Sequence, residues 1–237
     1  IVLNPVINGG GVSFKELKTV TISAPEKNSR IFYTTDGSTP TKNSIPYTKS
    51  LKFTNTIELK AVAVNKDGVA SFVTTAYFKK APHNWSITLG KPYEQQYDGG
   101  GNDGLIDAVR GSTNWRKGNW QGYQKVNPEF IIDLKKVTPI STVTAGFLQD
   151  SRAWIIVPKE FIIETSMDGK NFTQVYKGEN FLPADDLNIQ VKNIVASFPK
   201  TNAQFVKVTA VQFGKMPAWS EGAGGDTHIF VDEIIVE

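Results

Sequence analysis

Short apolar runs with an alternating pattern recur along the whole chain, and each is bounded by glycine, asparagine, aspartate or proline. The segment Thr56–Val64 alternates polar and apolar residues, as a half-buried antiparallel strand does. Similar runs predict strands at Thr19–Ile22, Arg30–Thr34, Ala70–Phe78, Phe130–Leu134, Ile140–Phe147, Glu160–Ser166, Gln204–Ala210 and Ile229–Val236. Helical periodicity is confined to short turns near Leu105–Val109 and Pro183–Asp186. The pattern predicts an all-β protein built from β-sandwiches.

A change in amino-acid composition near Pro82 predicts a domain boundary. The chain has 237 residues, whereas one immunoglobulin-sized sandwich takes only about 100. The stretch Lys79-Lys80-Ala81-Pro82-His83 follows a strand-like run, and all five tryptophans come after it. We therefore expect two modules, residues 1–80 and 83–237.

Composition narrows the possible functions. The formal net charge is only +3, because 26 Lys and Arg are balanced by 23 Asp and Glu. This balance gives no basic stripe, so nucleic acid is not an expected partner. The absence of cysteine excludes disulfides, thiolate zinc sites and a cysteine nucleophile. No apolar run reaches the roughly 20 residues of a membrane span, and the start at Ile1 is interpreted as an excised or processed chain.

The first module carries one informative phrase, Ile31-Phe-Tyr-Thr-Thr-Asp-Gly-Ser-Thr-Pro-Thr41. A strand runs here into the turn pair Asp36-Gly37, and side chains of the turn can bond their own backbone. The phrase resembles the immunoglobulin-like C-terminal domain of bacterial chitobiases and β-hexosaminidases. The resemblance implies a spacer beside a hydrolase and no catalytic residue, so Asp36 is expected to be a structural turn residue.

The second module contains several phrases in a fixed order. They include Tyr97-Asp-Gly-Gly-Gly-Asn-Asp-Gly104, Glu129-Phe-Ile-Ile-Asp-Leu134, Ser166-Met-Asp-Gly-Lys-Asn-Phe172 and Asp232-Glu-Ile-Ile-Val236. In this order they resemble the discoidin, or coagulation factor 5/8 type C, family. Its carbohydrate-binding branch is common on bacterial glycosidases. Together the two resemblances imply an Ig-like domain followed by a galactose-binding-domain-like jelly roll. The ligand loops of the jelly roll are expected at one end.

The same resemblance implies a structural calcium ion. In the family, the loop after the first strand and an acid near the C-terminus hold this ion with carboxylate and carbonyl oxygens. Carried over, the side-chain ligands are Asp107, Ser112 and Glu233, with carbonyls around Leu105 and Arg110. The alternative is that Asp107 caps a turn while Glu233 faces solvent.

Sugar binding needs an aromatic face and planar polar groups. The expected ligand is a glycan containing a hexose or N-acetylhexosamine, and the candidate contacts are Trp219, Gln149, Arg152, Trp120, Gln121 and Asp103. Trp154 precedes an apolar run and is expected in the core, Trp115 and Trp85 are expected to pack, and Trp120 could equally be structural. The galactose-binding branch uses a His and an Arg on neighbouring loops. Here Arg152 has no such His, which leaves the sugar open.

Independent catalysis is not expected. A glycosidase needs two carboxylates across a cleft, whereas the adjacent pairs Asp185-Asp186 and Asp232-Glu233 would point in opposite directions on a strand. Three alternatives follow: a carbohydrate-binding appendage of a chitobiase-like or β-hexosaminidase-like hydrolase, a structural tail that packs on the catalytic domain, and an adhesion module. The family implies a periplasmic, cell-surface or extracellular location in bacteria.

Overall fold

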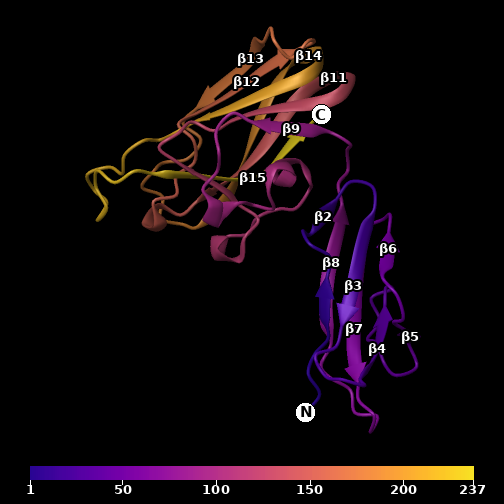
Figure 1. Cartoon of the computed structure of the whole chain (residues 1–237). Coiled ribbons are helices and arrows are strands. Elements are labelled where there is room, and N and C mark those ends of the chain that lie inside the picture. Colours follow the sequence, from indigo (N-terminus) through magenta and orange to yellow (C-terminus); the bar gives the residue numbers. More distant parts are fainter. The chain divides into compact units, whose positions relative to one another are not determined.

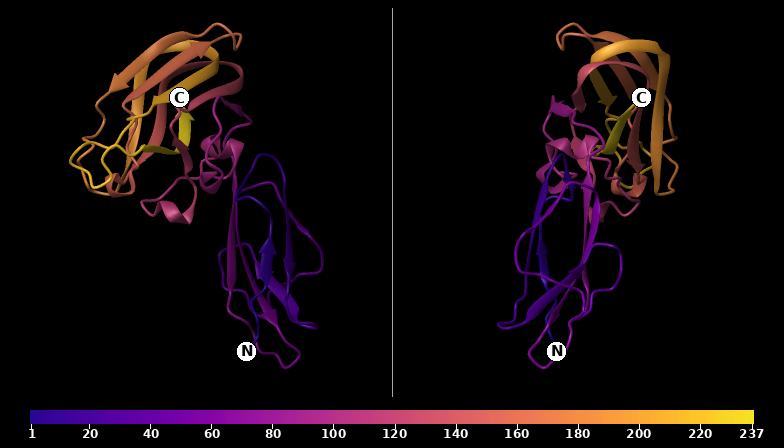
Figure 2. Two further views of the ribbon diagram at one scale, coloured as in Figure 1. Left: turned by 60° about the vertical axis from the view of Figure 1, so that its left-hand side comes forward. Right: turned by 90° about the vertical axis from the view of Figure 1, so that its right-hand side faces the viewer.

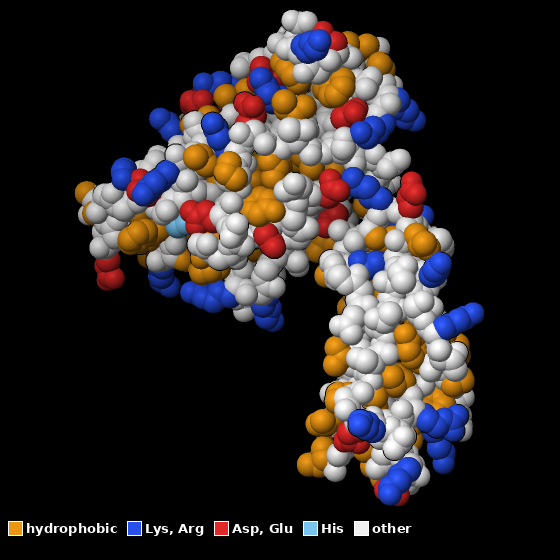
Figure 3. Space-filling view, viewed as in Figure 1, with side chains coloured by type: hydrophobic (Ala, Val, Ile, Leu, Met, Phe, Trp, Pro, Cys, Tyr) orange, Lys and Arg blue, Asp and Glu red, His pale blue; other side chains and the backbone are white.

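A computed structural model describes residues 1–237, which divide into two compact units, Ile1–Pro82 and His83–Glu237. Both units are β-sandwiches, as the sequence pattern predicted. Figure 1 traces the strands of each unit, and Figure 2 gives two further views. No helix has the length and apolar character needed to cross a bilayer. Figure 3 shows positive and negative side chains interspersed over the face it presents, without a continuous basic stripe.

The first unit is a small two-sheet sandwich. One sheet has the order β1-β3-β6 and the other the order β2-β8-β7-β4-β5. The strands are β1 Val6–Asn8, β2 Ser13–Phe14, β3 Lys18–Ser23, β4 Arg30–Thr34, β5 Ile45–Pro46, β6 Leu51–Phe53, β7 Ile57–Val64 and β8 Thr74–Lys80. Val20, Leu59 and Phe78 are among the buried residues of its core. The alternation of β3, in which every second residue is buried, places one face of that strand inside.

The turn after β4 is held by Asp36, as expected from the sequence. Its carboxylate accepts hydrogen bonds from the Ser38 amide at 3.0 Å and the Ser38 hydroxyl at 2.5 Å. These bonds hold the pKa of Asp36 below its usual value. Asp36 therefore closes a structural turn.

The second unit is a jelly roll built around two very long strands, β11 Glu129–Gln149 and β14 Gln190–Val211. The strand order is β10-β15-β11-β14-β12-β13, and β9 also pairs with β11. The other strands are β9 Ser86–Leu89, β10 Gln121–Gln124, β12 Glu160–Ser166, β13 Thr173–Glu179 and β15 His228–Val236. Phe130, Phe147 and Phe161 lie among the buried aliphatic side chains of its core. Short 3-10 turns occur at η1 Gln95–Tyr97, η2 Asn102–Ile106, η3 Trp115–Lys117 and η4 Ser151–Ala153.

Several strand limits differ from the sequence prediction. The expected strands Phe130–Leu134 and Ile140–Phe147 are one strand, β11, whose pairing with β14 shifts register between Asp133 and Thr138. A bulge of this kind bends a strand without ending it, so β11 continues through the break. The run Gln204–Ala210 is only the end of β14, and β8 begins at Thr74 and not at Ala70.

Candidate functional site

A pocket of about 500 Å³ lies at the loop-bearing end of the second unit. Three segments line it: the turn after β11 with Arg152 and Trp154, the loop before β14 with Leu187, and the loop between β14 and β15 with Trp219 and Glu221. The last of these loops is coloured yellow in Figure 1. The pocket thus collects side chains that lie about seventy residues apart in sequence, because neighbouring strands end at the same edge of the sandwich.

Trp154 is the most constrained residue of the pocket. β11 ends at Gln149, η4 follows, and Trp154 then takes the left-handed conformation with φ +62° and ψ +21°. Its amide donates to the Ser151 carbonyl at 3.2 Å, and its carbonyl accepts from the His228 amide at 2.8 Å. This conformation is unfavourable for a bulky residue. The expectation that Trp154 is a core residue is wrong, since 38% of it is exposed.

Trp219 lies on a loop whose base is closed by backbone hydrogen bonds. The Met216 amide donates to the Gly225 carbonyl at 2.8 Å, and the Gly224 amide donates to the Met216 carbonyl at 2.9 Å. Met216 is buried, which anchors the loop, whereas Trp219 is 47% exposed. Trp219 is therefore exposed and lines the pocket, while its contact with a ligand stays a prediction.

The two tryptophans belong to one packed unit. A Cβ atom on Gly222 would lie 2.3 Å from the Trp154 indole, and one on Gly225 would lie 2.9 Å from it. The Trp219 loop thus presses glycine backbone against Trp154, and any side chain there would push the indole away. The position of Trp154 depends on these two glycines.

Three of the predicted ligand contacts are buried and serve the fold. Trp120 is 1% exposed and donates its indole N–H to the Ser112 carbonyl at 2.9 Å. Gln121 is fully buried; its amide donates to the Gly101 carbonyl at 2.7 Å and accepts from the Tyr123 hydroxyl at 2.8 Å. Gln149 is fully buried and donates to the Pro183 carbonyl at 2.7 Å. Their side chains cannot reach a ligand in this structure, because the surrounding loops close over them.

The remaining predicted contacts divide between the pocket and another surface. Arg152 lines the pocket, as expected. Asp103 is exposed in η2, outside this pocket, and its neighbour Asn102 lines a different hollow. Trp115 and Trp85 are partly buried against the cores, in agreement with the expectation that they pack.

The two carboxylates expected to bind calcium lie together in the interior. Asp107 and Glu233 are each 4% exposed. Asp107 accepts from the Val109 amide at 2.8 Å, and Glu233 accepts from the Ala108 amide at 2.9 Å. Burial, and then the nearby charge of Asp107, raises the pKa of Glu233 to about 8. Asp107 does cap a turn, but Glu233 does not face solvent.

The third expected calcium ligand takes a different position. Ser112 is exposed, and its hydroxyl donates to the Asn114 carbonyl at 3.4 Å. No group of three or more His, Cys, Asp or Glu side chains with the arrangement of a metal site occurs in residues 1–237. Two neighbouring buried carboxylates are nevertheless a donor set that suits a hard cation such as Ca²⁺.

Comparison with known families agrees with the two-module architecture. Residues 8–75 match the chitobiase/beta-hexosaminidase C-terminal domain, and residues 93–224 match the F5/8 type C domain. The chain belongs to the F5/8 type C family. A search of curated proteins gave no match.

Solved structures similar to the F5/8 type C module include two bacterial domains. The first is the CBM32-5 domain of CpGH89 from Clostridium perfringens, in complex with GalNAc-β-1,3-galactose, with 21% identity and a TM-score of 0.41 over 65% of this chain and 94% of that one. The second is the C-terminal domain of a chitobiase from Bacteroides fragilis, with 17% identity and a TM-score of 0.41 over 65% and 93%. Similarity at this level does not extend to individual residues.

An ion pair inside the F5/8 type C module supports the loop that carries Asp107. Arg110 Nε lies 2.8 Å from Asp232 Oδ2, and the Gly111 amide donates to the same oxygen at 2.9 Å. Burial raises the pKa of Asp232, while Arg110 acts in the opposite direction. A Cβ atom on Gly146 would lie 2.1 Å from Asp232 and 2.3 Å from Arg110. Glycine at position 146 is thus required for the pair to form.

Sequence analysis missed the Arg110–Asp232 pair and the exposure of Trp154. The pair joins residues 122 positions apart, and no short motif marks it. Trp154 could have been suspected from its position shortly after the predicted strand Ile140–Phe147, but the apolar run Ile155–Val157 concealed it.

Proposed function

We propose that the F5/8 type C module is a non-catalytic carbohydrate-binding module whose ligand contacts Trp154 and Trp219. The observation that supports this most strongly is the pair of half-exposed indoles in one pocket, one of them held in an unfavourable backbone conformation. Exposed aromatic rings stack on the apolar face of a sugar. Strained residues that the surrounding structure holds in place occur preferentially at functional sites.

The polar groups of the pocket suit a glycan containing a hexose or N-acetylhexosamine. Arg152 supplies a planar donor, Glu221 supplies an acceptor, and the Ser220 hydroxyl can do both. Glu221 is the one carboxylate among the lining residues. Because glycoside hydrolysis uses two carboxylates across a cleft, this pocket is suited to binding and not to cleavage.

The buried carboxylates are proposed to hold a structural calcium ion. Asp107 and Glu233 would supply side-chain oxygens, and carbonyl groups near Leu105 and Arg110 would supply others. Ser112 would join only if its hydroxyl turned away from Asn114. The ion would neutralise two like charges that burial otherwise opposes, and it would hold the segment 105–110, at the end of η2 and after it, against β15.

The first module is proposed to be a spacer in a larger bacterial glycoside hydrolase of the chitobiase or β-hexosaminidase type. The family match of residues 8–75 supports this assignment. The catalytic domain of that enzyme would be the intramolecular partner, and the protein would act in the periplasm, at the cell surface or outside the cell.

A glycan array followed by calorimetry tests the binding proposal. The 237-residue chain is applied to the array with calcium and with a chelator, and each hit is titrated against the wild type, Trp219→Ala and Met167→Ala. Trp219 exposes 47% of its surface, which is about 100 Å² of a large aromatic side chain. A sugar covering one face buries about half of that area, worth roughly 1.3 kcal/mol at about 25 cal/mol per Å².

Trp219→Ala is therefore expected to weaken binding about tenfold. Met167 is equally exposed but does not line the pocket, so Met167→Ala should bind like the wild type. An array without a hit in the presence of calcium, or equal affinities for the three proteins, would contradict the proposal.

A further inference from the structure

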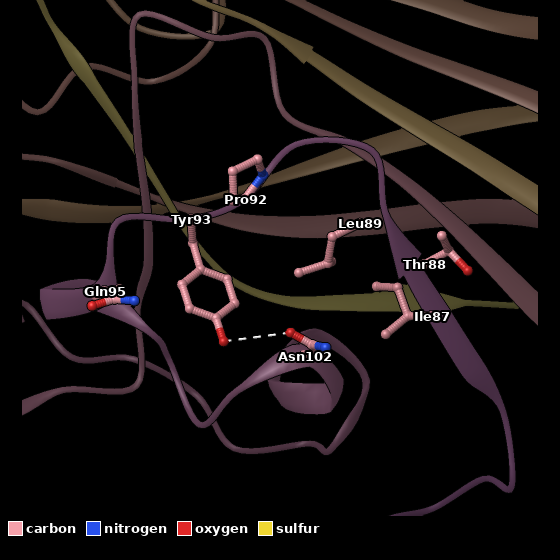
Figure 4. A pocket seen from close by; sticks show the side chains of 7 residues that line it. All are labelled: Ile87, Thr88, Leu89, Pro92, Tyr93, Gln95 and Asn102. Carbon is pink, nitrogen blue, oxygen red and sulfur yellow. Dashed lines mark hydrogen bonds between the residues drawn. The ribbon is translucent and has the colours of Figure 1, made fainter.

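A second hollow of about 580 Å³ opens on the F5/8 type C module, beside the edge strand β9. It lies between β9, the segment 92–95 and the 3-10 turn η2 (Figure 4). Ile87 and Leu89 point into it from β9, and Tyr93 points into it from the facing segment, while Thr88 points away. None of its lining residues belongs to the Trp154–Trp219 pocket.

The walls of this hollow are fixed by the core. Leu89 pairs with Phe130 and Ile87 pairs with Ile132, both on β11, so the β9 wall is part of the main sheet. The facing segment is tied to β10 because the Glu94 amide donates to the Gly122 carbonyl at 2.9 Å. A hollow with fixed walls is preformed, and a preformed site loses little entropy when a ligand binds.

The lining chemistry selects a neutral ligand. Ile87, Leu89, Pro92 and the Tyr93 ring form an apolar surface, and no charged side chain lines the hollow. A charged group placed there would lose water without gaining a partner. The volume lies within the range of small-molecule sites.

Two exposed amides supply the polar contacts. Tyr93 donates its hydroxyl to Asn102 Oδ1 over a long 3.4 Å, which leaves the Asn102 NH₂ group for a ligand. Gln95 is exposed and can both donate and accept. Amides of this kind pair with the N–H and C=O of an acetamido group, and the aliphatic wall can receive its methyl group.

From this combination we infer that the hollow is a second saccharide site, selective for neutral N-acetylated sugars. The pyranose ring of an N-acetylhexosamine carries an apolar face, hydroxyl groups and an acetamido group, which matches the apolar wall and the two amides. The site is independent of the tryptophan pocket and is a prediction in addition to the proposed function.

Nuclear magnetic resonance of the ¹⁵N-labelled 237-residue chain tests the inference. The probe is N,N′-diacetylchitobiose, titrated to high millimolar concentration, and the readout is the side-chain NH₂ signals of Gln95 and Asn102. These signals are expected to shift with saturation in the wild type and equally in Trp219→Ala, where the first pocket is impaired. Gln95→Ala and Asn102→Ala change exposed side chains outside the core and should each weaken this binding at least tenfold.

Two further probes test selectivity. Protonated glucosamine, which carries a charge and lacks the acetyl group, is expected not to shift the two signals. A neutral peptide, N-acetyl-trialanine amide, carries an acetamido group without the pyranose ring and is expected to shift them less than the disaccharide does. The inference is overturned if the disaccharide does not shift these signals, if the shifts disappear in Trp219→Ala, or if the peptide shifts them and the disaccharide does not. Because Trp219→Ala reports on the first pocket alone, failure of either site can be recognised separately.

Discussion

The buried Glu233 carboxyl makes the stability of the metal-free chain dependent on pH. Its pKa is raised from 4.5 to about 8 in the folded state by burial and by Asp107. The folded state therefore keeps a proton that the unfolded state has released, and the resulting loss of stability grows as the pH rises from 4.5 to 8. Since each pH unit of such a difference is worth about 1.4 kcal/mol, the loss approaches an order of 5 kcal/mol at pH 8.

Glu233→Gln removes the ionisation and keeps the shape of the side chain. The amide oxygen of glutamine can still accept from the Ala108 amide, as Glu233 does at 2.9 Å. With a chelator at pH 8, the variant is expected to melt roughly 10 °C or more above the wild type, because about 1 kcal/mol corresponds to a few degrees in a chain of this size. At pH 5 the two proteins should melt at nearly the same temperature.

Calcium should reverse this order. A ligand that binds only the folded state stabilises it by RT ln(1 + [L]/Kd), so millimolar calcium should raise the melting temperature of the wild type and leave Glu233→Gln unchanged. Differential scanning fluorimetry at both pH values provides the measurement, with Glu221→Gln as the control because Glu221 is an exposed carboxylate. Equal melting temperatures of wild type and Glu233→Gln at pH 8 in chelator, together with no calcium effect, would refute this reasoning.

Two further substitutions test the packing that supports the site. Gly146→Ala would place a methyl group 2.1 Å from Asp232 and 2.3 Å from Arg110. Asp232 is buried while the Arg110 side chain is 37% exposed, so separating the pair should lower the free energy of unfolding by about 1–3 kcal/mol; an unchanged urea midpoint would show that the pair does not matter. Trp154→Gly relieves the left-handed conformation, worth about 1–2 kcal/mol, but it also removes an indole that packs against Gly222 and Gly225. The free energy of unfolding should therefore fall by about 1–3 kcal/mol, and calorimetry should record at least a tenfold loss of sugar affinity. Unchanged affinity would remove Trp154 from the site.

Local sequence patterns were sufficient for most strands. The strand Glu160–Ser166 was predicted with its observed limits, because alternation and the following Asp168-Gly169 turn both mark it. β11 was predicted as two strands, and the residues between them, 135–139, are mostly polar and end in Pro139. In the structure Pro139 lies just after the register shift, where proline is tolerated within a sheet. β11 pairs with β14 on both sides of the register shift. This pairing joins residues far apart in the sequence, so it cannot be predicted from the alternation of residues within β11.

The pocket that we propose as the binding site was predictable only in part. Trp219 was expected on an exposed loop because of the glycines that follow it, and Arg152 because it follows a predicted strand; both line the pocket. Trp120 and Gln149 were also predicted to contact a ligand from their positions in loops, but both are buried. Whether a loop residue is exposed depends on how other loops pack over it, and the local sequence does not reveal this packing. Asp107 and Glu233 lie 126 positions apart in the sequence. They were expected to lie close together because of the family resemblance and not because of any local pattern.

The closed base of the Trp219 loop has a consequence for evolution and engineering. Lys215 pairs with Asp226 in an antiparallel bridge, and Thr227 bonds to Gly214 just outside it. Residues 217–221 form the tip of this loop, beyond the closed base. Trp219 and Glu221 in the tip are exposed. Such a loop can exchange its tip without disturbing β14 or β15. Under the proposed function, replacing a few residues of the tip would change which sugar the module binds without changing the scaffold.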